Sequence, residues 1–282
     1  MKIINAHLHL IELDKVLPDQ EKYLGLLQSI PSFKNLDETL ALISPESVLK
    51  QMEEAGITTS VLFACYAPLL YASNEFVSRM CEQHRDQFIG FASVDPRDKN
   101  APQVLEHAVN VLGLRGLKLH PPLQDFYAND HAVWPIYETA AALNIPVVFH
   151  VGSTPFGHMV KLSQANPLLI DEVAVAFPKL NIILTHLGTL WHNETFMVVE
   201  KNPNVYLDTA AYPYEIKELL TMKLIERLGE DKLIFGTDFP MPYERKTHRM
   251  KDYVCCINSL ALPLDIKEKI FSKNLESLLR AK

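Results

Sequence analysis

Short apolar runs recur along the chain, each rich in β-branched side chains and each followed by polar or small residues. The apolar character within a run is almost continuous, which is typical of a strand buried on both faces of a parallel sheet. Eight runs have this pattern, and we expect a strand over each of residues 2–6, 57–63, 88–94, 115–119, 145–149, 181–184, 205–208 and 232–236.

Helical patterns separate these runs. Ser44, Pro45 and Glu46 provide an N-cap, a first-turn proline and an acidic first turn, and Gly56 provides the matching end of that helix. Further helices are expected over residues 73–86, 101–112, 132–143, 163–177, 191–200, 214–228, 247–260 and 263–279. Strands that alternate with helices predict a parallel sheet with right-handed crossovers. Eight such units favour an α/β fold closed into a single (β/α)₈ TIM barrel over an open doubly wound sheet.

The spacing of the strands also bears on domain organisation. Barrels of ~250 residues routinely form one domain, so we expect residues 1–282 to be a single domain with a C-terminal helix. Residues 11–43 are an insertion after the first strand, which a barrel places over its C-terminal face, where active sites lie. We interpret the insertion as a lid-like segment, with a short helix over residues 21–29. An outer packing segment is the alternative.

Composition narrows the class of protein. Hydrophobic residues make up 48% and charged residues 22% of the chain, as in ordinary globular proteins. The net charge of −7 argues against a general nucleic-acid binder, which would show a basic stripe. Four cysteines without a C-x-x-C pair fit a reduced, cytoplasmic protein. The longest apolar run is shorter than the ~20 residues of a membrane span. We expect a small-molecule substrate, no nucleic-acid partner and no membrane partner. A homodimer is left open, since dimers are the commonest assembly.

Metal-binding side chains stand at the ends of the predicted strands. His7 and His9 end the first strand two residues apart, so both imidazoles can face the same side. His150, His186 and Asp238 follow the fifth, sixth and eighth strands. A lone residue of this kind is usually a core histidine or a helix-capping aspartate. Five of them at one face of one barrel predict a site for a divalent metal.

Sequence motifs around these residues occur in a characteristic order. They are Asn5 to His9, Phe91 to Pro96, Gly116 to Pro121, Phe149 to Gly152, Thr185 to Gly188, Phe235 to Pro240 and Asn274 to Leu279. The ordered set resembles the amidohydrolase superfamily, and within it the amidohydrolase 2 group of metal-dependent TIM-barrel proteins. The resemblance covers essentially the whole chain. One departure is Asn5, which stands where the family usually has aspartate.

The resemblance implies specific roles. His7, His9, His150 and Asp238 are expected to hold one divalent metal, zinc ahead of Mn²⁺ or Fe²⁺. Such an ion lowers the pKa of its bound water toward ~7. Asp238 is expected to act in catalysis by accepting the water's proton and passing it to the leaving group. His186 is expected to orient the water or to polarise a substrate carbonyl.

Three further residues are candidate substrate contacts. Lys118 and His120 stand two apart on the fourth strand, so both can face inward. Some superfamily members carry a carboxylated lysine that bridges two metals. We favour instead an ammonium that neutralises a substrate carboxylate or Asp238. His120 would contact substrate or support a ligand, with a structural role as its alternative. Arg245 follows the last strand, where a solvated helix start also explains it.

The expected function follows from this site. The leading hypothesis is a metal-dependent hydrolase of a small amide, lactone or related carbonyl compound. The alternative is a non-oxidative decarboxylase of an unsaturated or aromatic carboxylic acid, whose carboxylate Lys118 and Arg245 could bind. A ligand-binding barrel without turnover is a third class, disfavoured because all the expected metal ligands are present.

Overall fold

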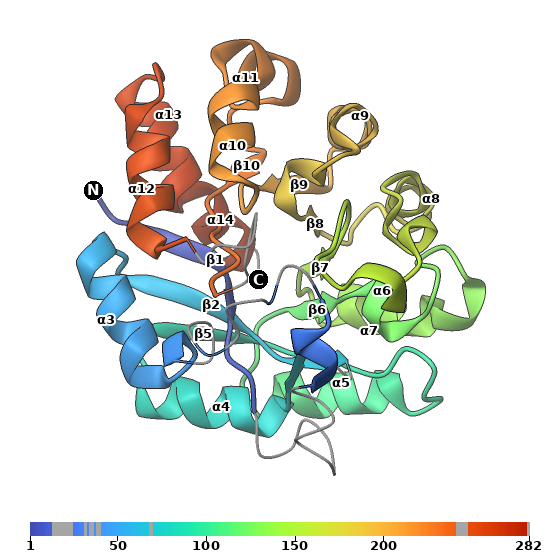
Figure 1. Ribbon diagram of the computed structural model, residues 1–282. Coiled ribbons are helices and arrows are strands. Elements are labelled where there is room, and N and C mark those ends of the chain that lie inside the picture. The colour runs from blue at the N-terminus through green and yellow to red at the C-terminus, as the bar shows by residue number, and fades with distance from the viewer. Residues whose placement is uncertain are drawn as a thin grey trace.

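A computed structural model describes residues 1–12, 25–30, 33, 37, 41–67, 70–240 and 248–280 of the chain. In this part of the chain, eight parallel strands lie inside a ring of helices (Figure 1). The strands are β1 (Ile4–His9), β2 (Thr59–Phe63), β5 (Phe88–Phe91), β6 (Leu117–Leu119), β7 (Val147–Phe149), β8 (Ile182–Leu184), β9 (Val205–Asp208) and β10 (Leu233–Ile234). Each lies within or overlaps one of the eight predicted runs.

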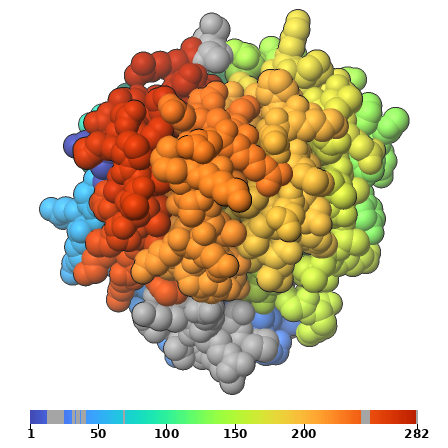
Figure 2. Space-filling view, turned by 90° about the horizontal axis from the view of Figure 1, so that it is seen from above, coloured from blue at the N-terminus to red at the C-terminus, as the bar shows by residue number. Residues whose placement is uncertain are grey.

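Hydrogen bonds close the strands into a barrel. The strand orders β1-β2-β5 and β10-β9-β8-β7-β6 are joined on one side by a parallel bridge between Ala92 and Leu117. On the other side the Ala6 N–H donates to the carbonyl of Phe235 at 2.8 Å. The closed (β/α)₈ barrel is therefore confirmed. The C-terminal helix α14 (Asn274–Arg280) lies beside N-terminal residues, since Lys2 pairs with Glu276 at 2.7 Å, and red helices adjoin blue residues in Figure 2.

Alternate strand residues fill the barrel interior. Val61, Phe63 and Val148 belong to a buried cluster on the barrel axis, whereas their neighbours pack outward against the helices. Leucines of α14 (Asn274–Arg280) join this inner cluster and cover one end of the barrel. Lys118 of β6 is in register with Val148 of β7, so its side chain also faces the axis.

The outer helices follow the predicted order. The helix α3 (Pro45–Ala55) has the expected caps, since Ser44 accepts from the Ser47 N–H and Gly56 adopts a φ of 69°. The expected helix over residues 214–228 is instead two helices, because Leu220 leaves the helical conformation and Thr221 caps the second one. The outer helices are α4 (Asn74–Gln83), α5 (Ala101–Asn110), α7 (Trp134–Ala142), α8 (Leu168–Ala176), α9 (His192–Lys201), α10 (Pro213–Leu219), α11 (Met222–Leu228), α12 (Met250–Ser259) and α13 (Leu264–Glu268).

An apolar cluster forms over the mouth of the barrel; we call it the cap cluster. It contains Leu27, Ile30, Phe33, Cys65, Ala67, Leu70, Leu123 and Phe156. The sequence did not predict two of its sources, the hairpin of β3 (Cys65–Ala67) with β4 (Leu70–Ala72) and the short helix α6 (Pro121–Gln124). Much of the predicted lid-like insertion, including residues 13–24 and 38–40, lies outside the described residues. Its described part supplies the first three members of the cluster.

No helix among the described residues has both the length and the apolar character needed to cross a membrane.

Candidate metal centre

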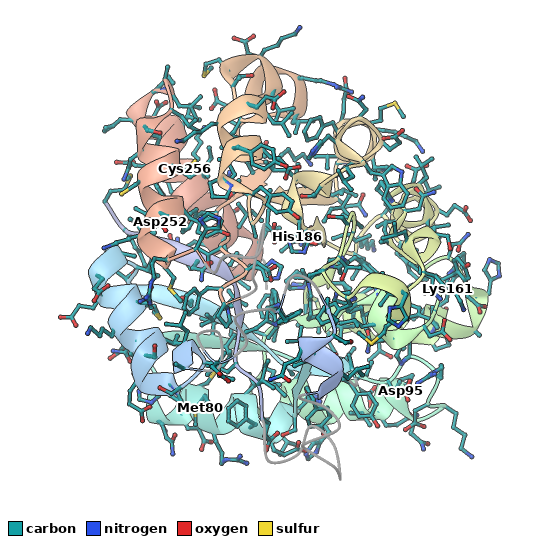
Figure 3. The ribbon with its side chains drawn as sticks, viewed as in Figure 1. Met80, Asp95, Lys161, His186, Asp252 and Cys256 are labelled. Carbon is teal, nitrogen blue, oxygen red and sulfur yellow. The ribbon has the colours of Figure 1, made fainter. Side chains whose placement is uncertain are left out.

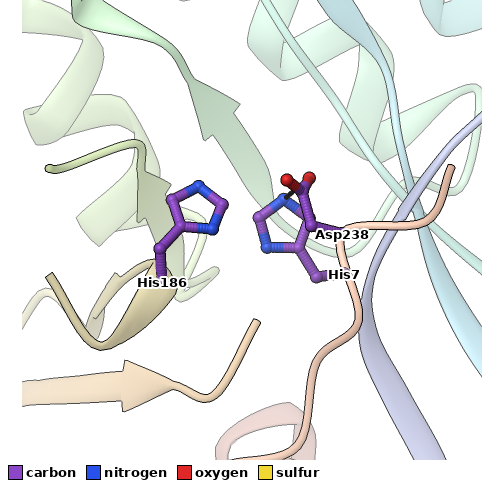
Figure 4. A group of neighbouring side chains, drawn as sticks. All are labelled: His7, His186 and Asp238. Carbon is purple, nitrogen blue, oxygen red and sulfur yellow. Dashed lines mark ion pairs between the residues drawn. The ribbon is translucent and has the colours of Figure 1, made fainter. Parts of the chain in front are cut away.

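Three side chains from the first and last strands converge at the mouth of the barrel. His7 and His9 end β1, and Asp238 follows β10. The Nε2 atoms of His7 and His9 are 3.2 Å apart, and Asp238 Oδ1 lies 3.0 Å from the first and 3.2 Å from the second. Three atoms so spaced leave room for one ion at about 2.1 Å from each of them. His7 and Asp238 appear in Figure 4 with His186 facing them.

The hydrogen-bond partners of His7 leave its Nε2 facing the carboxylate of Asp238. Its Nδ1 donates to Asp208 Oδ2 at 2.7 Å, because a carboxylate can only accept. The Nε2 of the neutral ring is then a bare lone pair, and it faces the carboxylate of Asp238. Two electron-rich atoms 3.0 Å apart need a proton or a metal ion between them. Burial lowers the pKa of His7, but the carboxylates of Asp238 and Asp208 outweigh burial and raise it.

Asp208 acts as the support of the centre. Besides binding His7, its Oδ1 accepts from the backbone N–H groups of His186 at 2.7 Å and Ala210 at 3.0 Å. A carboxylate that holds the far nitrogen of a metal-binding imidazole fixes the ring and its tautomer. Asp208 is not among the candidate site residues singled out from the sequence. The signal that could have found it is its place at the end of the barrel strand β9.

His150 and His186 form a second pair beside the triangle. His186 Nδ1 donates to the Ala210 carbonyl at 2.7 Å, so its Nε2 accepts from His150 Nδ1 at 3.0 Å. The Nε2 of His150 is buried and has no hydrogen-bond partner among the described residues. Burial lowers the pKa of both rings, which favours the neutral, metal-binding form. His7, His186 and Asp238 each offer one ligand atom within 4.8 Å of the others.

Two of these residues have an unusual backbone. Asp238 has a φ of 52° and His186 a φ of 63°, and neither is glycine. A left-handed conformation costs such a residue about 1–3 kcal/mol and persists only where the surroundings enforce it. Figure 3 places His186 toward the middle of the ring of helices. The backbone is thus strained at the two residues whose side chains enter the candidate centre.

The predicted substrate contacts differ in their surroundings. Lys118 is 1% exposed, and its Nζ has no hydrogen-bond partner within the described chain. It lies 5.0 Å from the centroid of the Phe63 ring, and burial lowers its pKa. His120 stacks on His150 with ring centroids 3.9 Å apart, and its Nδ1 accepts from the Leu123 N–H at the start of α6. These two contacts fix the orientation of the His120 ring. Arg245 lies outside the described residues.

The candidate residues share one small cavity. It is lined by His7, His9, Leu70, Lys118, His120, His150, Pro155, Phe156, His186 and Asp238. Its volume is about 20 Å³, enough for a water molecule but not for a benzene ring. Leu70 and Phe156 belong to the cap cluster, so the cap cluster forms part of the cavity wall near the candidate metal ligands.

Comparisons with known proteins place the chain among metal-dependent barrels. The profile of the family described as Amidohydrolase matches residues 4–281. A gamma-resorcylate decarboxylase of Polaromonas sp. is 24% identical over 251 residues, which are 68% of this chain and 76% of the relative. A TIM-barrel protein from Bordetella bronchiseptica superposes with a TM-score of 0.79 at 23% identity, covering 99% and 98% of the two chains. A dihydroxybenzoic acid decarboxylase from Polaromonas sp., solved with manganese and the inhibitor 2-nitroresorcinol, gives 0.74 at 19% identity, covering 99% and 96%.

These findings correct one prediction. The expected amide or lactone hydrolase is wrong, because the relatives above that have a known activity are decarboxylases of aromatic acids. The physical reason is that histidines and an aspartate at strand ends specify where a metal can sit. They do not specify whether the reaction that follows cleaves a C–N, C–O or C–C bond.

Proposed function

The chain belongs to the amidohydrolase family, and from this premise we propose that it is a metal-dependent, non-oxidative decarboxylase of a small aromatic or unsaturated carboxylic acid. One observation carries the proposal. The three ligand atoms of the triangle share a cavity with Lys118, whose buried Nζ has no hydrogen-bond partner among the described residues. A carboxylate substrate would accept from the Lys118 ammonium and bind an ion held by the triangle.

The donor set fits one divalent ion. His7, His9 and Asp238 would hold it, with the unpartnered Nε2 of His150 as the further ligand that the sequence predicted. We propose Mn²⁺ first, because a solved relative contains manganese, and Zn²⁺ remains the alternative. The ion supplies positive charge that binds substrate oxygens and stabilises the electron pair released when the C–C bond breaks.

Lys118 would bind the substrate carboxylate. An isolated charge in a dry interior costs several kcal/mol, and a bound anion relieves that cost. Its pKa is lowered by burial, so the ammonium also holds its proton less tightly than an exposed lysine does. His120, whose ring lines the same cavity, is proposed as a lateral contact to the substrate.

His186 would carry the proton that replaces CO₂ on the substrate carbon. Its Nδ1–H is fixed on the carbonyl of Ala210, so Nε2, which accepts from His150 Nδ1 and lines the cavity side of the ring, is the atom that would exchange a proton. Burial lowers its pKa, while the carboxylates of Asp238 and Asp208 act in the opposite direction and stabilise the protonated ring. Asp238 would assist by holding a substrate proton on its carboxylate.

The cap cluster would keep water away from the reaction. Water stabilises the localised charge of a carboxylate more than the dispersed charge of the transition state, so a closed cavity favours loss of CO₂. An aromatic acid needs more space than the cavity of about 20 Å³ offers, and we propose that movement of the cap cluster provides it. We further propose that residues 1–282 form one domain, with 11–43 as the lid. The cytoplasmic location, the homodimer and the contact by Arg245 stay predictions.

Measuring CO₂ release tests the proposal. Protein purified without chelators is loaded with Mn²⁺ or Zn²⁺ and incubated in D₂O with a panel of hydroxylated benzoic acids and unsaturated acids. We expect CO₂ and a product with one deuterium on the carbon that carried the carboxylate. Asp238→Asn should abolish turnover, and Asp171→Asn, on the outer helix α8, should not. Metal-loaded protein that releases no CO₂ from any acid would refute the proposal.

A further inference from the structure

The turn that carries His186 is strained over several residues. After β8, His186, Leu187 and Leu190 have φ values of 63°, 50° and 70°, and none of them is glycine. Strain of this kind persists only where surrounding contacts enforce it. From the β9 side, Asp208 and Ala210 fix the backbone N–H and the ring of His186. The backbone carbonyl groups of the turn need separate contacts to hold them.

Three side chains outside the cavity supply that support; we call them the clamp. They are Thr189, His192 at the start of α9 and Glu215 of α10. Thr189 Oγ1 lies 2.8 Å from the carbonyl oxygen of His186 and 3.0 Å from Glu215 Oε2. His192 Nδ1 lies 2.9 Å from the carbonyl oxygen of Leu187, and its Nε2 lies 3.3 Å from Glu215 Oε1. The clamp thus joins two consecutive carbonyls of the turn to two helices.

The contacts of His192 favour a charged clamp. Both ring nitrogens face oxygen acceptors, the Leu187 carbonyl and Glu215 Oε1, an arrangement that the doubly protonated ring satisfies best. Burial lowers the pKa of His192, but the hydrogen bond to Glu215, the Leu187 carbonyl and the charges of Glu215 and Glu218 raise it. Glu215 is 5% exposed, so water screens this pair weakly.

We propose that Thr189, His192 and Glu215 are positioning residues that hold the turn so that His186 Nε2 stays aimed into the cavity. None of the three lines that cavity, so they act through His186 and do not touch substrate. The inference rests on the proposed role of His186 in proton transfer. A ring displaced by about 1 Å from its productive position can cost 10²-fold in rate, so a loosened turn should reduce kcat more than KM.

Matched variants separate hydrogen bonding from packing. Thr189→Val removes the hydroxyl and keeps the shape, whereas Thr189→Ser keeps the hydroxyl. Glu215→Gln removes the charge and keeps the size. Glu226→Gln makes the same change on the exposed face of α11 and serves as the control.

Two readouts are measured on metal-loaded protein, and metal content is checked. Thr189→Val and Glu215→Gln should lower kcat about 10- to 100-fold with KM nearly constant, and amides 186–190 should exchange with deuterium at least tenfold faster. Thr189→Ser and Glu226→Gln should resemble wild type in both kcat and amide exchange.

If amides 186–190 of Thr189→Val and Glu215→Gln exchange as slowly as in wild type, the clamp proposal is wrong, whatever the turnover. If Thr189→Val and Thr189→Ser lower kcat and speed exchange equally, Thr189 acts by packing and not by its hydroxyl, and the clamp proposal is also wrong. Amide exchange needs no substrate, so this test still applies if the decarboxylase proposal fails. If Thr189→Val does not fold, Glu215→Gln carries the test alone.

Discussion

Replacing Asp208 with asparagine should weaken metal binding although Asp208 is not itself a proposed ligand. The aspartate accepts three hydrogen bonds, one from His7 Nδ1 and two from the backbone N–H groups of His186 and Ala210. Asparagine has the same shape, but one of its two polar atoms is an NH₂ donor. In either amide orientation, that NH₂ faces a donor.

The clash between the asparagine amide and a neighbouring donor would change the tautomer of His7, and the new tautomer would bind the metal ion less tightly. If the NH₂ faces His7, the ring relieves the clash by moving its proton from Nδ1 to Nε2. That proton then occupies the lone pair that faces His9 and Asp238, where the metal ion would bind. Loss of such a supporting carboxylate typically costs 10- to 100-fold in metal affinity, or about 1.4–2.7 kcal/mol.

Isothermal titration of the metal-free protein with Mn²⁺ measures the effect. The dissociation constant of Asp208→Asn should rise by about 10- to 100-fold. Asp171→Asn, whose carboxylate pairs with Lys201 on the surface, should bind as wild type does. Nitrogen-15 spectra of the histidine rings should report the proton of His7 on Nε2 in the variant. Unchanged affinity together with a wild-type His7 tautomer would refute the reasoning.

Three further predictions follow from the same contacts. Lys118→Met should raise the melting temperature, since the cost of burying the amine outweighs its attraction to Asp208 and Asp238, and it should raise the KM for the acid; the exposed Lys223→Met should change neither. Phe156→Ala should cost about 3–5 kcal/mol of unfolding free energy in urea denaturation and lower kcat by admitting water; unchanged stability would contradict the closed cap. The raised pKa of His192 means that its ion pair with Glu215 stabilises the fold at low pH, and this stabilisation is lost as the pH rises through the folded pKa. Above pH ~6.5, the melting temperature of wild type should therefore fall more steeply with pH than that of His192→Gln. Parallel curves of melting temperature against pH would argue against the pair.

The sequence predicted the barrel because its signals are local. A buried parallel strand is a continuous apolar run, and the chain contains eight of them, so their order and the face on which their polar ends meet follow directly. The hairpin of β3 and β4 was missed because residues 61–72 form one apolar run, within which nothing marks where the barrel strand ends. Pairing across that hairpin depends on contacts with the cap cluster, which are distant in sequence.

The site was predicted as far as residue type carries chemistry. His7, His9 and Asp238 were expected to converge, and they do. The roles of Asp208 and Glu215 depend on which nitrogen or carbonyl each one faces, and spacing along the chain does not contain that information. The reaction was predicted wrongly for the same reason: it depends on how a substrate lies relative to the ligands, and residue types along the chain do not contain that information.

Because the first and last barrel strands pair with each other, the order in which the chain is synthesised has a chemical consequence. His7 and His9 are synthesised long before Asp238, and β10 must dock beside β1 before the three side-chain atoms meet. A nascent chain, or one truncated before β10, therefore carries the two histidines without the carboxylate. The proposed ion would bind tightly only after Asp238 has been made and the first and last barrel strands have paired.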